Sequence, residues 1–200
     1  MDLAALVLTF GAIFVVELPD KTFLATLVLA TKYRPVLVWI GVGAAFAVQT
    51  TVAVLLGSAA GFLPEDVVHL VAMAMFAIGA VVLLREGLSH HRASMAEGEE
   101  EFGAEAAPAT GFRAVLASFL VLFAAEWGDL SQLLTISLVA RYDAPVEVFL
   151  GALGALLLVS GLAVVAGRTL LRYVALHWLH YVGAAICAVL ATLTLVELVR

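Results

Sequence analysis

The sequence predicts an all-α, polytopic membrane protein whose six transmembrane helices form two inverted three-helix repeats. Its composition is the first reason: 64% of its 200 residues are hydrophobic and 13% are charged, with a mean hydropathy of +1.12. Soluble domains average about 45–50% apolar and about 25% charged residues. The second reason is that apolar runs long enough to span a bilayer recur along the chain. The third is that the two halves of the chain match each other in sequence.

Each expected span is an apolar run of about 20 residues that ends at a polar turn. The first span is interrupted at Pro19, whereas Pro35 opens the second at a position where helices accept proline. The first run also continues past the length of a signal-peptide core, so we expect it to be retained as a span. The six spans are expected at residues 3–30, 35–57, 67–84, 112–139, 146–166 and 173–199.

Between the third and fourth spans the character of the chain changes. Five of its sixteen acidic residues lie between residues 97 and 105, among glycine, alanine and phenylalanine. Such a composition predicts a solvated linker. The expected organisation is a first three-helix repeat over residues 1–88, an acidic linker over 89–111 and a second three-helix repeat over 112–200.

The two halves align with a nearly constant offset. At an offset of 109 residues, Glu17 and Asp20 match Glu126 and Asp129, and single-residue insertions later raise the offset to 110 and 111. Because each repeat has an odd number of helices, the second copy enters the membrane from the opposite face. Inverted repeats with interrupted helices near the midplane are typical of secondary transporters.

Positive charge is distributed unequally between the two sets of loops. The side opposite the central linker holds Arg141 and Arg200. By the positive-inside rule, the central acidic loop is expected in the cytoplasm and both termini outside, in a multi-pass protein of the cell membrane. The linker side holds seven basic residues: Lys32, Arg34, Arg85, Arg92, Arg113, Arg168 and Arg172.

Two motifs place carboxylates inside the apolar runs. They read Glu17-Leu-Pro-Asp20-Lys21-Thr22 and Glu126-Trp-Gly-Asp129-Leu-Ser131. The spacing of three predicts that the two acids of each motif share one face of a helix. A charged residue at a helix centre opposes insertion by about 2.5–3.5 kcal/mol, so four such residues need partners. If the repeats pack about a pseudo-twofold axis, all four acids converge near the middle of the membrane.

The groups near the motifs favour binding of a hard cation. Only oxygen ligands are available there, which favours Ca²⁺, Mn²⁺ or Mg²⁺ over Zn²⁺ or copper. We therefore expect Glu17, Asp20, Glu126 and Asp129 to bind a divalent cation as a transported substrate. Clustered carboxylates in a low dielectric favour protonation, so protons are the expected coupling ions. No resident cofactor is expected, and the chain is not expected to be an enzyme.

Further polar groups are expected to support these acids. Thr22 and Ser131 add hydroxyl oxygens close to each acid pair. Pro19 has no N–H to donate to the carbonyl of Val15, which leaves that oxygen available to a cavity. Lys21 is placed to pair with Glu17 when the ion leaves. Additional lining groups are expected at Gln49, Thr50, Gln132 and Ser160.

The two motifs resemble the signature Glu-x-Gly-Asp-(Lys/Arg)-(Ser/Thr) of a membrane-protein family. That family includes Golgi transmembrane protein 165, chloroplast relatives and bacterial manganese exporters, within the lysine-exporter-like superfamily. The resemblance covers nearly the whole chain and implies a divalent cation/proton antiporter that exports Mn²⁺ or Ca²⁺ from the cytoplasm. Two positions depart from the signature: Pro19 replaces a glycine, and Leu130 replaces a basic residue. The acids and hydroxyls that the resemblance implies are Glu17, Asp20, Glu126, Asp129, Thr22 and Ser131.

Two other functions remain open at this point. A small-solute exporter of the amino-acid type would need a roomier and less uniformly acidic site. An intramembrane aspartyl protease is the formal rival because Asp129 follows a glycine, although the repeated Glu and Asp pairs fit ion coordination better. No concentration of basic residues suggests nucleic acid, so the expected partners are the divalent cation and membrane lipid. The sequence leaves open whether the chain forms a homodimer.

Overall fold

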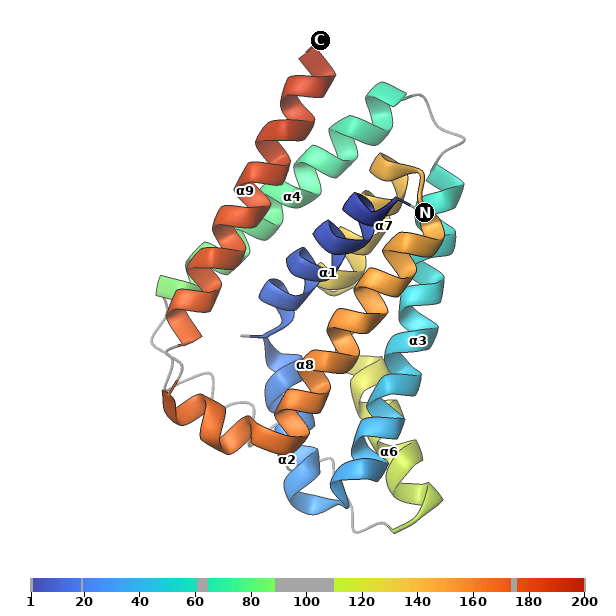
Figure 1. Ribbon diagram of the computed structural model, residues 1–200, viewed down its shortest axis with the longest axis vertical. Coiled ribbons are helices and arrows are strands. Elements are labelled where there is room, and N and C mark those ends of the chain that lie inside the picture. Colours follow the sequence, from blue (N-terminus) through green and yellow to red (C-terminus); the bar gives the residue numbers. More distant parts are fainter. Residues whose placement is uncertain (1, 19, 61–64, 89–109, 174–175, 200) are drawn as a thin grey trace.

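The computed structural model describes residues 2–18, 20–60, 65–88, 110–173 and 176–199, and this part of the chain is all-helical (Figure 1). The all-α expectation is therefore confirmed. The helices, with the labels of Figure 1, are α1 (Leu3–Glu17), α2 (Lys21–Lys32), α3 (Pro35–Ala60), α4 (Glu65–Leu88), α6 (Phe112–Ala125), α7 (Leu130–Tyr142), α8 (Pro145–Tyr173) and α9 (Leu176–Val199).

The described helices provide two to four candidate membrane spans. Pro35–Ala60 and Pro145–Val165 are each long and apolar enough to cross a membrane alone. Two more spans result if α1 with α2, and α6 with α7, are each counted as one bent span. Helices α4 and α9 contribute shorter apolar stretches, Met73–Arg85 and Ala184–Val196. These helices do not establish the six spans expected from the sequence.

Both bends fall on the acidic motifs. The bend between α1 and α2 is 67°, and that between α6 and α7 is 71°. In the second motif Gly128 has φ 78°, a backbone conformation that favours glycine, and Asp129 caps α7 with an extended backbone. Pro19 in the first motif lies outside the described residues. The expectation that each acid pair shares one face of a continuous helix is wrong, because the helices break between the two acids.

The two halves of the chain pack onto each other. Helix α3 packs against α6, and α8 packs against α1. Both contacts depend on a glycine: a Cβ on Gly41 would lie 2.3 Å from the Val115 carbonyl oxygen, and one on Gly151 would lie 2.6 Å from the Leu6 carbonyl oxygen. Gly41 corresponds to Gly151 at the offset of 110, and Leu6 corresponds to Val115 at the offset of 109. The two contacts are therefore equivalent in the two repeats. Each of these helices therefore packs against a helix of the other half.

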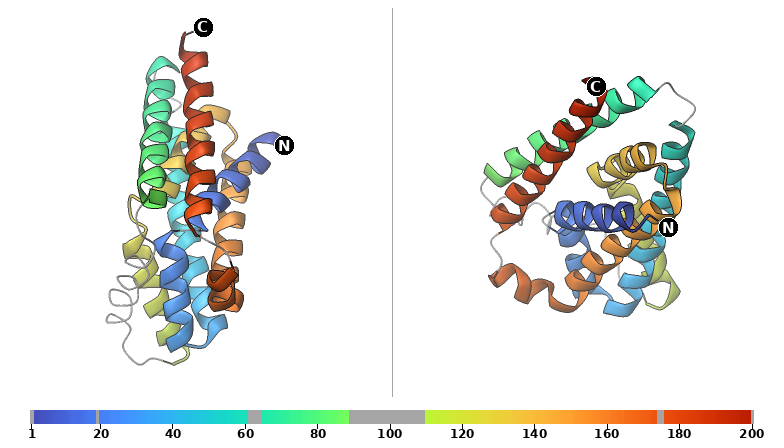
Figure 2. Two further views of the ribbon diagram at one scale, coloured as in Figure 1. Left: turned by 90° about the vertical axis from the view of Figure 1, so that its left-hand side faces the viewer. Right: turned by 45° about the horizontal axis from the view of Figure 1, so that its top comes forward.

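The half-helices lie at opposite ends of the molecule. Figures 1 and 2 show α1 and α7 toward the end that carries both termini, and α2 and α6 toward the other end. Helices α4 and α9 lie side by side, with α4 against α7 and α9 against α1. The breaks therefore lie near the middle of the molecule, with one half-helix from each repeat on either side.

Large apolar side chains cover much of the outer surface. Val36 is 67% exposed, Leu55 65%, Leu120 54% and Val146 62%. A water-soluble monomer rarely exposes apolar surface on this scale, whereas a lipid-facing surface requires it. The buried side chains form one large apolar cluster around the helix breaks and a smaller one near Phe23. This distribution is that of a membrane protein.

Candidate functional site

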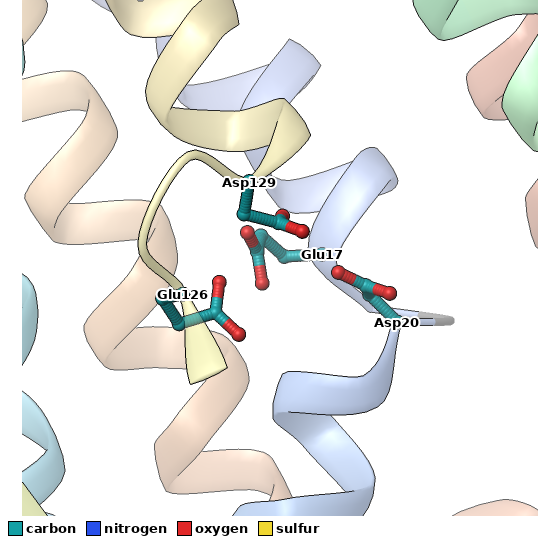
Figure 3. Close-up of side chains that lie close together, drawn as sticks. All are labelled: Glu17, Asp20, Glu126 and Asp129. Atoms are coloured by element: carbon teal, nitrogen blue, oxygen red, sulfur yellow. The ribbon is translucent and has the colours of Figure 1, made fainter. Parts of the chain in front are cut away.

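Four carboxylates from the two motifs meet where the helices break. One oxygen each of Glu17, Asp20, Glu126 and Asp129 lies within 4.8 Å of the others. Figure 3 shows the four side chains pointing toward one another. Glu17 ends α1, Asp20 precedes α2, Glu126 follows α6 and Asp129 caps α7. The predicted convergence of these acids is therefore present in the structure, although their binding of an ion stays a prediction.

Burial makes simultaneous ionisation of all four carboxylates unfavourable. Glu17 is fully buried and Glu126 is 3% exposed, whereas both aspartates are partly exposed. Two like charges 4.8 Å apart repel by about 3.5 kcal/mol at an effective dielectric constant of about 20. Four ionised carboxylates at this separation repel one another in six pairs. The cluster therefore requires cations or protons to offset its charge.

The Glu17 carboxylate shows this requirement most clearly. Both of its oxygens are buried and make no hydrogen bond of good geometry within the described residues, although the Ser131 hydroxyl interacts with the carboxylate. Buried polar atoms in folded proteins are almost always hydrogen-bonded or bound to an ion, since an unpartnered group is costly. Glu17 therefore presents two oxygens suited to a ligand that the protein itself does not supply.

A hydrogen bond between the halves orients the second buried glutamate. The Thr22 hydroxyl on α2 donates to Oε1 of Glu126 at the end of α6. The two residues lie in different repeats, so the contact joins the motifs directly. Ser131, the equivalent of Thr22 in the second motif, is buried at the start of α7. Both hydroxyls expected from the sequence lie next to the carboxylate cluster or its cavity.

The two predicted glutamines hold the broken backbone. Nε2 of Gln49 donates to the Phe123 carbonyl at 2.9 Å, and Oε1 of Gln132 accepts from the Gly128 N–H at 2.8 Å. These backbone groups lie at the α6–α7 break, where the regular helical pattern of hydrogen bonds ends. Both glutamines were expected to line the site, and their observed hydrogen bonds stabilise the chain conformation that presents Glu126.

A small polar cavity lies beside Glu126. Its volume, measured as the space open to the centre of a water molecule, is about 20 Å³. One water needs about 10–15 Å³ by this measure. The cavity therefore has room for one water molecule or one monatomic ion. Its polar lining residues are Gln49, Thr50, Glu126, Ser131, Gln132 and Thr135.

Other predicted positions have different outcomes. The Lys21 side chain lies outside the described residues, so its pairing with Glu17 stays a prediction. The same holds for the carbonyl of Val15, whose release depends on Pro19. The Ser160 hydroxyl donates to the Leu157 carbonyl of its own helix at 3.1 Å, and its place in the lining of the site stays a prediction.

Thr135 was not singled out as a site residue by the sequence, although it lines the cavity. It is 3% exposed, and its hydroxyl donates to the Ser131 carbonyl at 2.7 Å. A sequence signal existed, because Thr26 occupies the equivalent position in the first repeat. A buried hydroxyl repeated at the same distance from both motifs is a pattern that would identify it.

The comparisons with known proteins identify one family. The sequence model of a family described as "Divalent cation/proton antiporter GDT1" matches residues 5–91 and 114–200. A GDT1-like protein of Synechocystis sp. is 35% identical over 142 residues, which cover 66% of this chain and 68% of that protein. No solved structure matches the chain significantly.

Two plant relatives match over nearly the whole chain. GDT1-like protein 1, chloroplastic, of Oryza sativa subsp. indica is 29% identical over 210 residues, which cover 96% of this chain and 61% of that protein. Protein PAM71, chloroplastic, of Arabidopsis thaliana is 28% identical over 209 residues, which cover 95% of this chain and 56% of that protein. The chain thus spans about three-fifths of the length of these plant relatives.

Proposed function

The chain belongs to the GDT1 family of divalent cation/proton antiporters, and we propose that it exports Mn²⁺ or Ca²⁺ from the cytoplasm in exchange for protons. The observation that carries this proposal is the meeting of Glu17, Asp20, Glu126 and Asp129 within 4.8 Å at two helix breaks. Such a cluster binds a divalent cation or protons, but it is unfavourable without either. Its members come from both repeats, so relative motion of the repeats can open and close it.

The exchange follows from charge balance. A divalent cation bound among the carboxylates offsets two of their negative charges, and two protons offset the same charge after the ion leaves. Cation and protons compete for the same oxygen atoms, because a carboxylate must be deprotonated to act as a strong ligand. Competition at one buried site couples the two fluxes. The binding residues in this proposal are Glu17, Asp20, Glu126 and Asp129.

The donor atoms support the choice of cation. Carboxylate and hydroxyl oxygens suit Ca²⁺, Mn²⁺ and Mg²⁺, whereas zinc and copper sites favour nitrogen and sulfur. Asp20 and Asp129 are partly exposed, so water can complete the coordination shell. Mg²⁺ gives up its water reluctantly, which favours Mn²⁺ or Ca²⁺ in a buried site.

The proposed architecture is six spans in two inverted repeats, over residues 1–88 and 112–200, joined by an acidic linker over 89–111. Each bent pair, α1 with α2 and α6 with α7, then counts as one broken span. The supporting evidence is that both bends fall on the motifs and that Gly41 and Gly151 make equivalent contacts. The excess of basic residues in the linker-side loops supports a cytoplasmic linker, with both termini outside the cell membrane.

The donor set argues against a small-solute exporter of the amino-acid type. Four clustered carboxylates would repel the carboxylate of an amino acid, whereas they suit a divalent cation. An aspartyl protease is opposed by membership of a transporter family and by two glutamates that such chemistry does not need. Cation exchange therefore remains the function that the site supports best.

The proposal is tested by transport into proteoliposomes. Uptake of Mn²⁺, Ca²⁺ and Mg²⁺ is measured under an imposed pH gradient for the wild type, Glu17→Gln and Asp129→Asn. The wild type should accumulate Mn²⁺ or Ca²⁺ only when the gradient is present, and both variants should fall to the level of protein-free liposomes. Asp143→Asn is the matched control, since Asp143 is an exposed acid in the left-handed conformation that asparagine also accepts. Absence of divalent uptake by the wild type, or full activity of both variants, would contradict the proposal.

A further inference from the structure

The two sides of the carboxylate cluster occupy equivalent positions in the repeats but differ in chemistry. At the offset of 109, Gln132 on α7 corresponds to Phe23 on α2. At the offset of 110, Gln49 on α3 corresponds to Val159 on α8. The equivalent contacts of Gly41 and Gly151 support the same alignment in three dimensions. The two amide side chains near the second motif thus correspond to two apolar side chains near the first motif.

The polar side lies toward the termini. Gln132 and Thr135 belong to α7, which lies at the end of the molecule that carries both termini (Figures 1 and 2). Together with Gln49 they line the cavity beside Glu126. A buried water requires two to four polar partners, and this cavity supplies them. Beyond the cavity, α3 and α7 meet closely, with a Cβ on Gly57 only 2.7 Å from the Ile136 carbonyl oxygen.

The apolar side lies toward the opposite end. Phe23 and Ala163 are fully buried and Val159 is 1% exposed, and they pack together in one apolar cluster with Leu24. Phe14, Leu18 and Leu162 surround that cluster. Phe23 belongs to α2, whose position away from the termini is plain in Figures 1 and 2.

A buried hydroxyl lies three residues after Phe23 on α2. Thr26 on α2 is fully buried, and within the described part of the chain its hydroxyl has no hydrogen-bond partner. Its equivalent Thr135 lines the polar cavity and is hydrogen-bonded. Apolar constrictions in membrane pathways block ions and protons because they exclude water. The equivalent residues Gln132 and Phe23 therefore line the polar cavity on one side and an apolar cluster on the other.

We propose, on the basis of the function proposed for the carboxylate cluster, that Phe23 and Val159 form an apolar gate, which we call the Phe23 gate. It closes the path from the carboxylates to the face opposite the termini. The polar cavity beside Glu126 is the hydrated station on the termini side, from which water, protons and the cation reach the carboxylates. The gate prevents protons from crossing the protein when no divalent cation is exchanged.

Proton leak tests the gate. Proteoliposomes with an internal pH dye are given a pH gradient without divalent cations, and proton flux is compared for the wild type, Phe23→Gln and Val159→Thr. Both variants should leak protons several-fold faster than the wild type, because a polar side chain admits water into the seal. Val148→Thr is the matched control, since Val148 is a fully buried valine elsewhere on α8. Leak at the wild-type rate in both gate variants would overturn the proposal.

Thiol accessibility provides a second readout that needs no transport. In a Cys187→Ser background, which removes the chain's one cysteine, Thr26→Cys and Thr135→Cys are exposed to Ag⁺ in chloride-free buffer. Thiols left unreacted are then labelled with maleimide after unfolding. Thr135→Cys should react faster than Thr26→Cys, and adding Phe23→Gln should accelerate the reaction at residue 26.

The outcomes separate the two proposals. Equal reactivity of the two thiols, unchanged by Phe23→Gln, would overturn the gate even if the wild type exchanges cations. Conversely, a wild type that moves no divalent cation would contradict the function, whereas both leak and thiol reactivity would still report on the gate. Val159→Thr is nearly isosteric, so it decides the question if Phe23→Gln does not fold.

Discussion

Thr22 and Ser131 are hydroxyl residues through which each repeat acts on a carboxylate of the other. The Thr22 hydroxyl donates to Glu126 across the interface of the halves, and the Ser131 hydroxyl, its equivalent in the second repeat, interacts with Glu17 of the first. A donor stabilises the charged form of the carboxylate it faces. Each buried glutamate therefore faces a hydroxyl from the opposite repeat, which helps to hold its carboxylate in place.

Removal of the Thr22 hydroxyl should weaken cation binding. A hydrogen bond to a charged group contributes about 1.5–3 kcal/mol, so Thr22→Val should raise the Mn²⁺ dissociation constant by about tenfold to a hundredfold. Thr22→Ser keeps the hydroxyl and should bind nearly as the wild type does. The measurement is calorimetric titration of Mn²⁺ into the purified protein. Equal affinities for Thr22→Val and Thr22→Ser would show that the hydroxyl does not act on the site.

Cation affinity should fall as the pH falls. Protons compete with the cation for the carboxylate oxygens, so the apparent affinity should change by about tenfold per pH unit for each proton that binding releases. Glu17→Gln removes one protonation site and should give a shallower slope. Titration of Mn²⁺ at several pH values, with Asp143→Asn as control, measures both slopes. A pH-independent affinity in the wild type would contradict competition at one site.

The broken helices are the elements that create the site. At the α6–α7 break, Gly128 adopts φ 78° and its N–H is bonded to Gln132, while Gln49 bonds the Phe123 carbonyl. A continuous helix would instead bond such groups within itself and hold the acids at fixed helical spacing. The break separates Glu126 from Asp129, so both carboxylates can face those of the first motif. The glutamines make this conformation stable in an apolar environment.

Substitution at the break should therefore be costly. Gly128→Ala places a Cβ on a left-handed residue, where an L-residue costs about 1–2 kcal/mol, so both thermal stability and Mn²⁺ uptake should decrease. Gly11→Ala is the control, because Gly11 is inside α1 and a Cβ there meets no atom within 4 Å. That substitution should be neutral or stabilising by up to about 1 kcal/mol. Thermal unfolding followed by tryptophan fluorescence compares them, and equal stability of the two variants would contradict the strain at Gly128.

The molecule consists of two halves whose helices pack against each other. Helix α3 packs on α6 and α8 on α1, so the first and second repeats cannot separate without breaking both contacts. The arrangement is suited to a rocking motion of one half against the other about the cluster, which alternating access requires.

The α3–α6 and α8–α1 contacts should lose similar stability when their glycines are substituted. Gly41→Ala and Gly151→Ala each place a Cβ within 2.6 Å of a backbone oxygen, and overpacking of this kind costs about 1–3 kcal/mol. Both variants should therefore lower the thermal unfolding temperature by similar amounts, with Gly11→Ala again as the control. A large loss in one variant and none in the other would show that the two halves do not pack as equivalent repeats.

Sequence reasoning identified the site because its chemistry is local to each motif. Glutamate and aspartate within apolar runs stand out without any knowledge of the fold, and the offset of 109 pairs Glu17 with Glu126. Pro19 also indicated where the first helix could break. The bonds of Gln49 and Gln132 to the broken backbone were beyond reach, because a hydrogen bond across a helix interface depends on how helices are rotated and bent.

The sequence by itself determined that the chain is helical and apolar, that it is duplicated, and that four acids belong together. These properties depend on residue type and spacing, which are carried along the chain. Only the tertiary structure decided that the acids lie in breaks, that Thr22 bonds Glu126, and that Gln132 lines a cavity whereas its equivalent Phe23 packs in an apolar cluster. Those features depend on which helices meet and at what angle, and packing over long chain separations sets both.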